Sequence, residues 1–352
     1  MISELNNKAK QLLIDMINTP SFSGEEDGTA DLIEVFLKNE GIVYQRNQHN
    51  LWAVNEDFDK AKPSILLNSH HDTVKPNKGY TRDPHQAVIE DGKIYGLGSN
   101  DAGGCLVSLI ATFIYFYKKR DLKYNLILLA SAEEENSGDL GIRSMVPILP
   151  EIDFAIIGEP TLMQLAVAEK GLLVLDAYAH GTAGHAAHVR GDNAIYKAMD
   201  AIRWFESFKF PKVSETLHDT KMTVTQINAG SQHNVVPSTC HFVIDIRVND
   251  LYSNEEVLAI VKNNVDIEVK ERSLNLNSSS IAKNHEIVLA GISLGREVYG
   301  SPTLSDQANL SCPSLKLGPG DSLRSHTADE FIYEKEVFEG IELYIQILKK
   351  IL

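Results

Sequence analysis

The chain has 352 residues, of which 43% are hydrophobic and 23% charged, and a formal net charge of −15 at pH 7. This length favours two domains over one. The negative charge argues against nucleic acid or an anionic membrane as a partner, because both would repel the protein. Three scattered cysteines, no apolar run of membrane-spanning length and no signal-peptide pattern are typical of a cytoplasmic protein that spans no membrane.

The N-terminal half alternates helical and strand-like segments. Periodic apolar residues predict helices over residues 4–18, 27–39, 105–117 and 140–149. Short apolar runs predict strands at residues 51–54, 64–68, 125–130 and 154–157, and an Asp-Gly pair predicts a hairpin over 87–96. Strands that are apolar throughout are typical of a parallel sheet covered on both faces. This half therefore has α/β character.

The pattern changes near residue 166. Alternating segments predict strands at 172–178, 222–227 and 241–248, with helices at 193–207 and 254–264, which together indicate a small α+β layer. A polar hinge at 275–280 precedes a return to α/β character, with a helix at 287–299, a strand at 314–317 and a helix at 334–352. We therefore predict an α/β domain formed by residues 1–165 and 280–352, into which an α+β domain of residues 166–279 is inserted.

Acidic residues and histidines follow the predicted strands. Three consecutive carboxylates, residues 133–135, come directly after strand 125–130. They cannot all ionise in a dry site unless cations lie beside them, although an isolated acidic triplet is also typical of a solvated loop. His70 and Asp72 share one face of an extended segment, which suits a metal-bound histidine whose second ring nitrogen faces a carboxylate. A polar strand end is the alternative.

Two further carboxylates and a second histidine lie in turns. Asp101 lies in a glycine-rich loop before a helix, where a helix cap is the alternative. Glu159 follows strand 154–157 between Gly158 and Pro160, where the alternative is an ordinary turn. Two histidines and three carboxylates are what two Zn²⁺ ions sharing a bridging carboxylate require, with one carboxylate of the triplet free to take a proton from water. The five residues are His70, Asp101, Glu135, Glu159 and His326.

Six segments resemble, in the same order, the motifs of the M20 family of co-catalytic zinc aminoacylases and peptidases. They are SHHDTV at 69–74, GSNDAGG at 98–104, SAEEENSG at 131–138, GEPT at 158–161, HGTAGHAAH at 180–188 and SHTADE at 325–330. The resemblance implies two Zn²⁺ ions, for which Co²⁺ can substitute. It also implies that one zinc is held by His70 and Glu159, the other by Glu135 and His326, and both by Asp101.

The same resemblance assigns further roles. Asp72 would orient His70, and Glu134 would be the general base. The first domain would carry a central mixed, mostly parallel sheet, and residues 166–279 would be a lid and dimerisation domain of a homodimer. His185 would be a lid histidine that completes the oxyanion hole of the partner subunit, and Asn234 and Arg247 would hold the substrate's α-carboxylate. A surface histidine and a structural salt bridge are the alternatives for His185 and Arg247.

Within the family, segments 163–172 and 324–330 are similar to the acetylornithine deacetylase branch, including members that act on N-acylated citrulline in arginine biosynthesis. The implied reaction is hydrolysis of the N-acetyl or N-succinyl amide of ornithine or citrulline, and the partner is this small molecule. Lys75 and the pair Ala102-Gly103 depart from the residues that the family usually has at these positions, so the identity of the acyl group stays open.

The alternatives are a dipeptidase or aminopeptidase, a succinyl-diaminopimelate desuccinylase, and a binding protein that has lost catalysis. The presence of all five implied ligands and of Glu134 argues against the last.

Overall fold

The computed structural model describes residues 2–188 and 192–352. The chain divides into two compact units, one made of residues 1–167, 280–299 and 305–352, the other of residues 168–279 and 300–304. No helix among the described residues is both long enough and apolar enough to cross a membrane.

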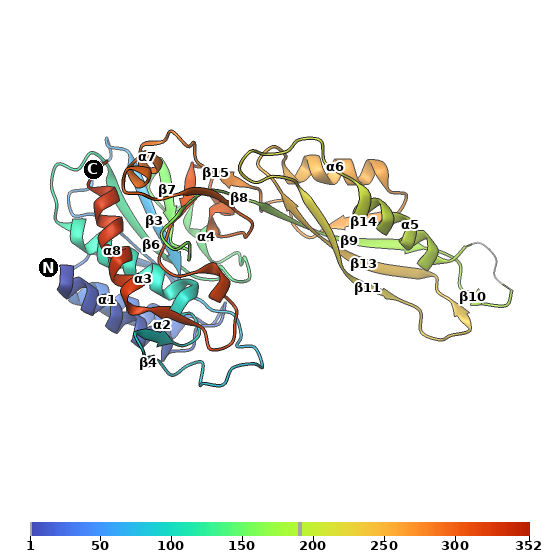
Figure 1. Cartoon of the computed structure of the whole chain (residues 1–352), viewed down its shortest axis with the longest axis horizontal. Helices are drawn as coiled ribbons and strands as arrows, with labels where there is room; N and C mark the ends of the chain where they lie inside the picture. The colour runs from blue at the N-terminus through green and yellow to red at the C-terminus, as the bar shows by residue number, and fades with distance from the viewer. Residues whose placement is uncertain (1, 189–191) are drawn as a thin grey trace. The chain divides into compact units, whose positions relative to one another are not determined.

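The larger unit is built on a mixed sheet (Figure 1). Strands β6, β3, β7 and β17 are parallel neighbours in its centre, and β1, β2 and β8 add antiparallel pairs. This confirms the predicted α/β class with a mixed sheet. In spatial order, the strands are β1 (Tyr44–Asn47), β2 (Asn50–Val54), β6 (Asn125–Ser131), β3 (Ser64–His70), β7 (Phe154–Ile157), β17 (Ser314–Lys316), β8 (Leu165–Glu169) and β15 (Ser279–Ser280), with β16 (Val298–Ser301) also paired to β8.

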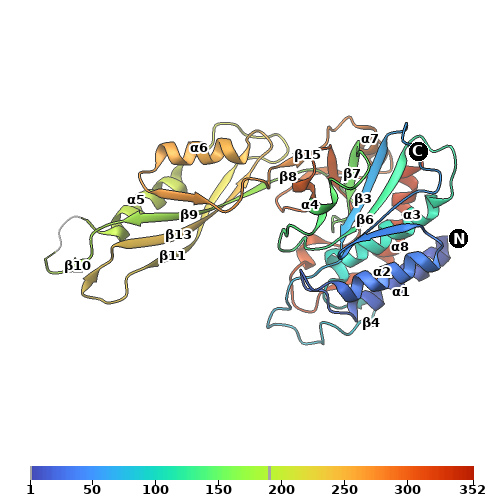
Figure 2. The same cartoon turned by 180° about the vertical axis from the view of Figure 1, so that it is seen from behind.

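Both faces of this sheet are covered, which explains its continuous apolar strands. Ile65 and Leu67 of β3 pack into the core shared with the helices α1, α3 and α8, whereas Leu66 packs into a smaller core beside α4. Figure 1 shows α1, α3 and α8 across one face, and Figure 2 shows the sheet from behind. The helices are α1 (Ile2–Ile17), α2 (Asp27–Asn39), α3 (Gly104–Tyr117), α4 (Ile142–Met145), α7 (Glu286–Ser293) and α8 (Glu334–Leu348).

Two predicted helices are much shorter than the sequence suggested, whereas the helix predicted over 334–352 ends only four residues early, at Leu348. The segment 140–149 is helical only over Ile142–Met145, because Pro147 has no N–H to donate to the Arg143 carbonyl, which would continue the helix. The segment 287–299 is helical only to Ser293, because Gly295 takes a positive φ of 78° and its N–H bonds back to the Ile292 carbonyl. Strand β16 follows where helix was predicted.

A small antiparallel sheet adjoins this core. The hairpin predicted over 87–96 is present, and Asp91 and Gly92 both take the positive φ that a tight hairpin turn requires. A third strand from the C-terminal region pairs with it. The strands are β4 (Val88–Glu90), β5 (Lys93–Tyr95) and β18 (Phe331–Tyr333).

The smaller unit is an antiparallel sheet with two helices. Alternate residues of β9, including Leu173 and Leu175, are buried in its own core with side chains of α5 and α6. Strand β11 is an edge strand, and most of its residues are exposed. The elements are β9 (Gly171–His180), β11 (Lys221–Ala229), β13 (Thr239–Val248), β14 (Glu268–Glu271), α5 (Ala194–Ser207), α6 (Asn254–Asn264) and the short pair β10 (Gly184–His185) and β12 (Val235–Val236).

Candidate metal centre

The candidate site lies at the carboxyl ends of three parallel strands. His70 is the last residue of β3, Glu159 comes two residues after β7, and the acidic triplet begins two residues after β6. Because β6, β3 and β7 are parallel neighbours, their carboxyl ends meet at one edge of the sheet. Open α/β sheets bind their ligands at this edge.

One group of three ligand atoms surrounds His70. The His70 Nε2 lies 3.4 Å from Asp101 Oδ1 and 3.9 Å from Glu159 Oε1. The Nε2 of His70 and the Oε1 of Glu159 are buried and have no hydrogen-bond partner among the described residues. The other ring nitrogen of His70 faces the Asp72 backbone carbonyl at 3.0 Å, so Nδ1 is the donor and Nε2 is directed into the group. Two orphaned buried polar atoms fit a cation that would bind them both.

A second group shares Asp101. The His326 Nε2 lies 3.0 Å from Glu135 Oε2 and 3.6 Å from Asp101 Oδ2. The ligand atoms within each group of three lie within 4.8 Å of one another. Asp101 therefore presents Oδ1 to the first group and Oδ2 to the second, which is the arrangement a bridging carboxylate requires. Asp101 and Glu135 are largely buried, whereas the His326 side chain is 55% exposed.

The electrostatics of the site also indicate cations. Burial and the neighbouring Asp101 raise the pKa of Glu159 to about 8, and burial raises the pKa of Glu134 well above its usual range. Burial alone would lower the pKa of His70, but the carboxylates of Asp101 and Asp72, 3.4 Å from its two ring nitrogens, outweigh burial and raise it. Protons bound to these side chains thus supply part of the positive charge that the clustered carboxylates require. Carboxylates and imidazoles at these distances are a donor set that suits Zn²⁺.

We expect metal binding to release protons at pH 7 and to weaken as the pH falls. The bond to Glu135 raises the pKa of His326 to about 9, so His326, like Glu159, holds a proton at pH 7 in the metal-free protein. Ligands must lose their protons, so the apparent affinity should rise up to about pH 8–9 and fall roughly tenfold per pH unit for each displaced proton. Calorimetry in two buffers of different ionisation enthalpy measures this release, and Glu159→Gln should release one proton fewer. Equal heats in both buffers would contradict the prediction.

Asp72 does more than face His70. Its Oδ1 lies 3.4 Å from His70 Nδ1, and its two carboxylate oxygens accept the backbone N–H groups of Glu134 and Glu135, each at 3.1 Å. The Ser23 hydroxyl donates a further bond of 2.7 Å. One buried carboxylate therefore fixes both the histidine and the acidic loop, and the spacing His-x-Asp predicted only the first contact.

Two other buried carboxylates were missed by the sequence analysis. Glu330 accepts the N–H groups of Asn100 and Asp101 at 2.8 and 2.9 Å, and burial raises its pKa to about 8. Asp306 accepts the Asn68 amide and the Ser131 hydroxyl, which lie near the ends of β3 and β6. Glu330 is the last residue of the SHTADE segment, so this motif could have indicated it as a site residue. No motif or spacing in the sequence indicates Asp306.

The other three predicted site residues lie in the smaller unit. His185 is exposed in β10, and its Nδ1 accepts the Ala187 N–H at 3.1 Å. The Asn234 backbone carbonyl accepts the Ala186 N–H at 2.9 Å, which joins the two loops that carry these residues. Arg247 donates from Nε and Nη2 to both oxygens of Asp245, at 2.8 and 3.0 Å. The salt bridge that the sequence analysis considered for Arg247 is therefore present.

Comparison with known proteins agrees with this architecture. The chain is 30% identical to an acetylornithine deacetylase of Shigella sonnei over 95% of both chains. It is 28% identical to a [LysW]-lysine/[LysW]-ornithine hydrolase of Sulfurisphaera tokodaii, covering 98% of this chain and 96% of the relative. The solved structure of a dinuclear metal-binding M20 peptidase from Bacillus subtilis superposes with a TM-score of 0.74 at 15% identity, over 99% of this chain and 98% of that one.

A match along most of the chain shows which family the protein belongs to. Residues 66–350 match the model of peptidase family M20/M25/M40, which confirms the family resemblance seen in the sequence motifs. The chain therefore belongs to peptidase family M20/M25/M40 and is a hydrolase that acts on amide bonds.

Proposed function

We propose that this protein is a di-zinc deacylase that hydrolyses the N-acyl amide of an acetylated or succinylated ornithine or citrulline, as a step of arginine biosynthesis. The observation that carries the proposal is Asp101, whose two carboxylate oxygens face two separate groups of ligand atoms. The substrate class is supported by the similarity to the acetylornithine deacetylase over nearly the whole chain.

The metal-holding residues divide into two sets in this proposal. His70 and Glu159 would hold one Zn²⁺ ion, Glu135 and His326 the other, and Asp101 both, and Co²⁺ would be an adequate substitute. Bound zinc lowers the pKa of water and polarises a carbonyl group. Asp72 keeps the Nδ1 proton of His70 in place, so that Nε2 is the atom available for coordination.

Glu134 is the proton carrier. Burial raises the pKa of its carboxyl group, and its backbone N–H is fixed by Asp72. A carboxylate with a raised pKa can accept the proton of the attacking water and return it to the leaving amine. The neighbouring Glu133 is unsuited to this role, because its Oε2 accepts the Leu140 N–H at 3.0 Å.

The smaller unit would bind the amino-acid part of the substrate. Asn234 and Arg247 would hold the α-carboxylate, for which a guanidinium is suited because it can bind two oxygens at once. The substrate would have to share the Arg247 guanidinium with Asp245, to which Nε and Nη2 are bonded. His185, on an exposed two-residue strand, would donate to the oxyanion formed in the partner subunit.

A side-by-side assay tests the reaction and the substrate. The zinc-loaded protein is given N-acetyl-ornithine, N-acetyl-citrulline, their N-succinyl counterparts, N-succinyl-diaminopimelate and a set of dipeptides. We expect the highest kcat/KM for one of the ornithine or citrulline amides. A preference for dipeptides or for the diaminopimelate derivative would overturn the substrate assignment, and hydrolysis of none of these amides would overturn the proposed function.

We also expect a homodimer in which the smaller unit of one chain serves the active site of the other. The exposed edge strand β11 supports this, since free edges are either protected or paired, and two identical edges can close around a two-fold axis. His185→Ala and Glu134→Gln homodimers should both be nearly inactive. In the mixed dimer, the site of the Glu134→Gln chain is served by the His185→Ala chain and carries both defects. The other site combines an intact Glu134 with an intact His185 and carries none.

The mixed dimer should therefore recover about half of the wild-type activity per dimer. The measurement is turnover of tagged heterodimers purified through both tags, with mixed wild-type and Glu134→Gln chains as the control. Heterodimers that form but recover no activity would show that His185 acts within its own chain or not at all.

A further inference from the structure

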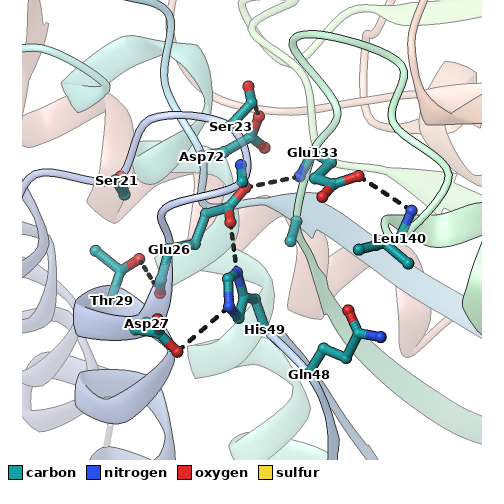
Figure 3. Close-up of polar contacts among 12 residues, drawn as sticks. Ser21, Ser23, Glu26, Asp27, Thr29, Gln48, His49, Asp72, Glu133 and Leu140 are labelled. Atoms are coloured by element: carbon teal, nitrogen blue, oxygen red, sulfur yellow. Dashed lines mark hydrogen bonds and ion pairs between the residues drawn. The ribbon is translucent and has the colours of Figure 1, made fainter.

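The acidic loop is held by a second buried carboxylate in addition to Asp72. Glu26 lies directly before α2, and its side chain is 0% exposed (Figure 3). Short polar side chains at this position usually cap the helix, but the longer Glu26 side chain makes no capping bond. Burying an ionisable group is costly unless every oxygen is paired, so the partners of Glu26 indicate its purpose.

Those partners join two distant segments. Glu26 Oε1 accepts the N–H of Gly24 at 2.8 Å and the N–H of Glu133 at 3.1 Å. Its Oε2 faces His49 Nδ1 at 2.6 Å, and the other nitrogen of this ring lies 3.3 Å from Asp27 Oδ1. Figure 3 shows Glu26 between His49 and the backbone of Glu133. Both oxygens are therefore used, one of them on the residue that precedes Glu134.

The backbone at Glu133 needs such an anchor. Glu133 has a φ of 54°, a left-handed conformation that is unfavourable for a residue with a side chain. Its carbonyl accepts the Gly138 N–H at 2.9 Å, so the loop closes on itself directly after this residue. Counting Asp72, three consecutive N–H groups, those of residues 133–135, each donate to a buried carboxylate.

We propose that Glu26 is a positioning residue, which fixes the Glu133 backbone so that the Glu134 carboxylate points to the reacting amide. This rests on the proposed role of Glu134 as proton carrier. Glu26 differs from Asp72 in making no hydrogen bond or ion pair to any of the five proposed metal ligands, so it acts on the base and leaves the metal ions in place. Its nearest control is Glu25, a carboxylate one residue away that is exposed.

The first test needs no substrate. Hydrogen exchange followed by mass spectrometry is measured on the zinc-loaded wild type, Glu26→Ala and Glu25→Ala. We expect at least tenfold faster exchange in the peptide covering residues 131–141 of Glu26→Ala, with no such change in Glu25→Ala and with the zinc content unchanged. Unchanged exchange in this peptide would overturn the proposal. If Glu26→Ala does not fold, Glu26→Asp replaces it, because its shortened side chain withdraws the oxygens from the Glu133 N–H.

The second test links the loop to turnover. Glu26→Ala should lower kcat at least tenfold and change KM less than threefold, and Glu26→Gln, which keeps an acceptor at Oε1, should recover most of the loss. In a Glu134→Gln background, Glu26→Ala should have no further effect on the residual rate, because residues that act as a unit are not additive. An equal loss in both backgrounds, or a Glu26→Ala kcat within twofold of wild type, would overturn the proposal.

If Glu134→Gln itself retains turnover, the proposed base is wrong, and the exchange experiment still decides whether Glu26 holds the loop.

Discussion

Replacing Glu134 by Gln should reduce turnover by about 10²–10⁴-fold, the usual contribution of general acid–base catalysis. The substitution keeps the size and shape of the side chain and removes the group that accepts a proton. The backbone N–H of residue 134 still donates to Asp72, so the loop should remain in place. Zinc content should stay near that of the wild type, because Glu134 is not one of the five proposed ligands. The measurements are kcat on the preferred substrate and the zinc content of the same sample.

Glu133→Gln is the matched control for this experiment. The Glu133 side chain accepts the Leu140 N–H, and an amide oxygen can accept the same bond. We therefore expect a loss of less than about fivefold, since a neutral hydrogen bond replaces a charge-assisted one. A Glu134→Gln protein that retains a third of the wild-type turnover would show that the base is another residue. A greater loss of turnover for Glu133→Gln than for Glu134→Gln would show the same.

Removing the metal ions should abolish turnover and leave the protein folded. The sheet is covered by an apolar core on each face, and the residues of these cores do not include any of the proposed ligands. A chelated sample should keep its circular dichroism spectrum and a cooperative unfolding transition. Its unfolding temperature should fall by several degrees, because a ligand present at about 100 times its Kd stabilises the folded state by about 2.7 kcal/mol.

Restoring Zn²⁺ or Co²⁺ to the chelated protein is the control for this result. Activity should return with two equivalents of metal per chain, since both groups of ligands are required. Turnover that persists after complete removal of the metal would contradict the account, as would full recovery with a single equivalent. A chelated sample that loses its secondary structure would show that the ions support the sheet itself.

The central strands of the larger unit could be predicted because each has a local apolar signature. Strand β7 spans the predicted residues 154–157, and Phe154 and Ala155 pack into cores on opposite faces of the sheet. The two shortened helices reflect single residues, Pro147 and Gly295, that outweigh the apolar pattern around them. Strand β8, Leu165–Glu169, was not predicted. Two of its five residues are alanine and one is glutamate, and both residue types favour strands weakly.

The site could be predicted only in part. The structure brings the five proposed ligands together in two groups, and their role as ligands stays a prediction. Of the residues that hold the site in place, Asp72 was predicted from its spacing to His70, whereas Glu26 and Glu330 were not. Glu26 bonds to a residue 107 positions away and Glu330 to residues about 230 positions away, through backbone N–H groups that are the same in every residue type. No spacing rule can find a partner of this kind, because the fold alone determines which N–H group each carboxylate meets.

The central claim is that two metal ions share Asp101, and anomalous diffraction from crystals of the zinc-loaded protein, measured at the zinc absorption edge, tests it most directly. We predict two peaks about 3.5 Å apart, with the Asp101 carboxylate between them. One peak should lie against His70 and Glu159, and the other against Glu135 and His326. A single peak at full zinc loading, or two peaks that the Asp101 carboxylate does not bridge, would contradict the account.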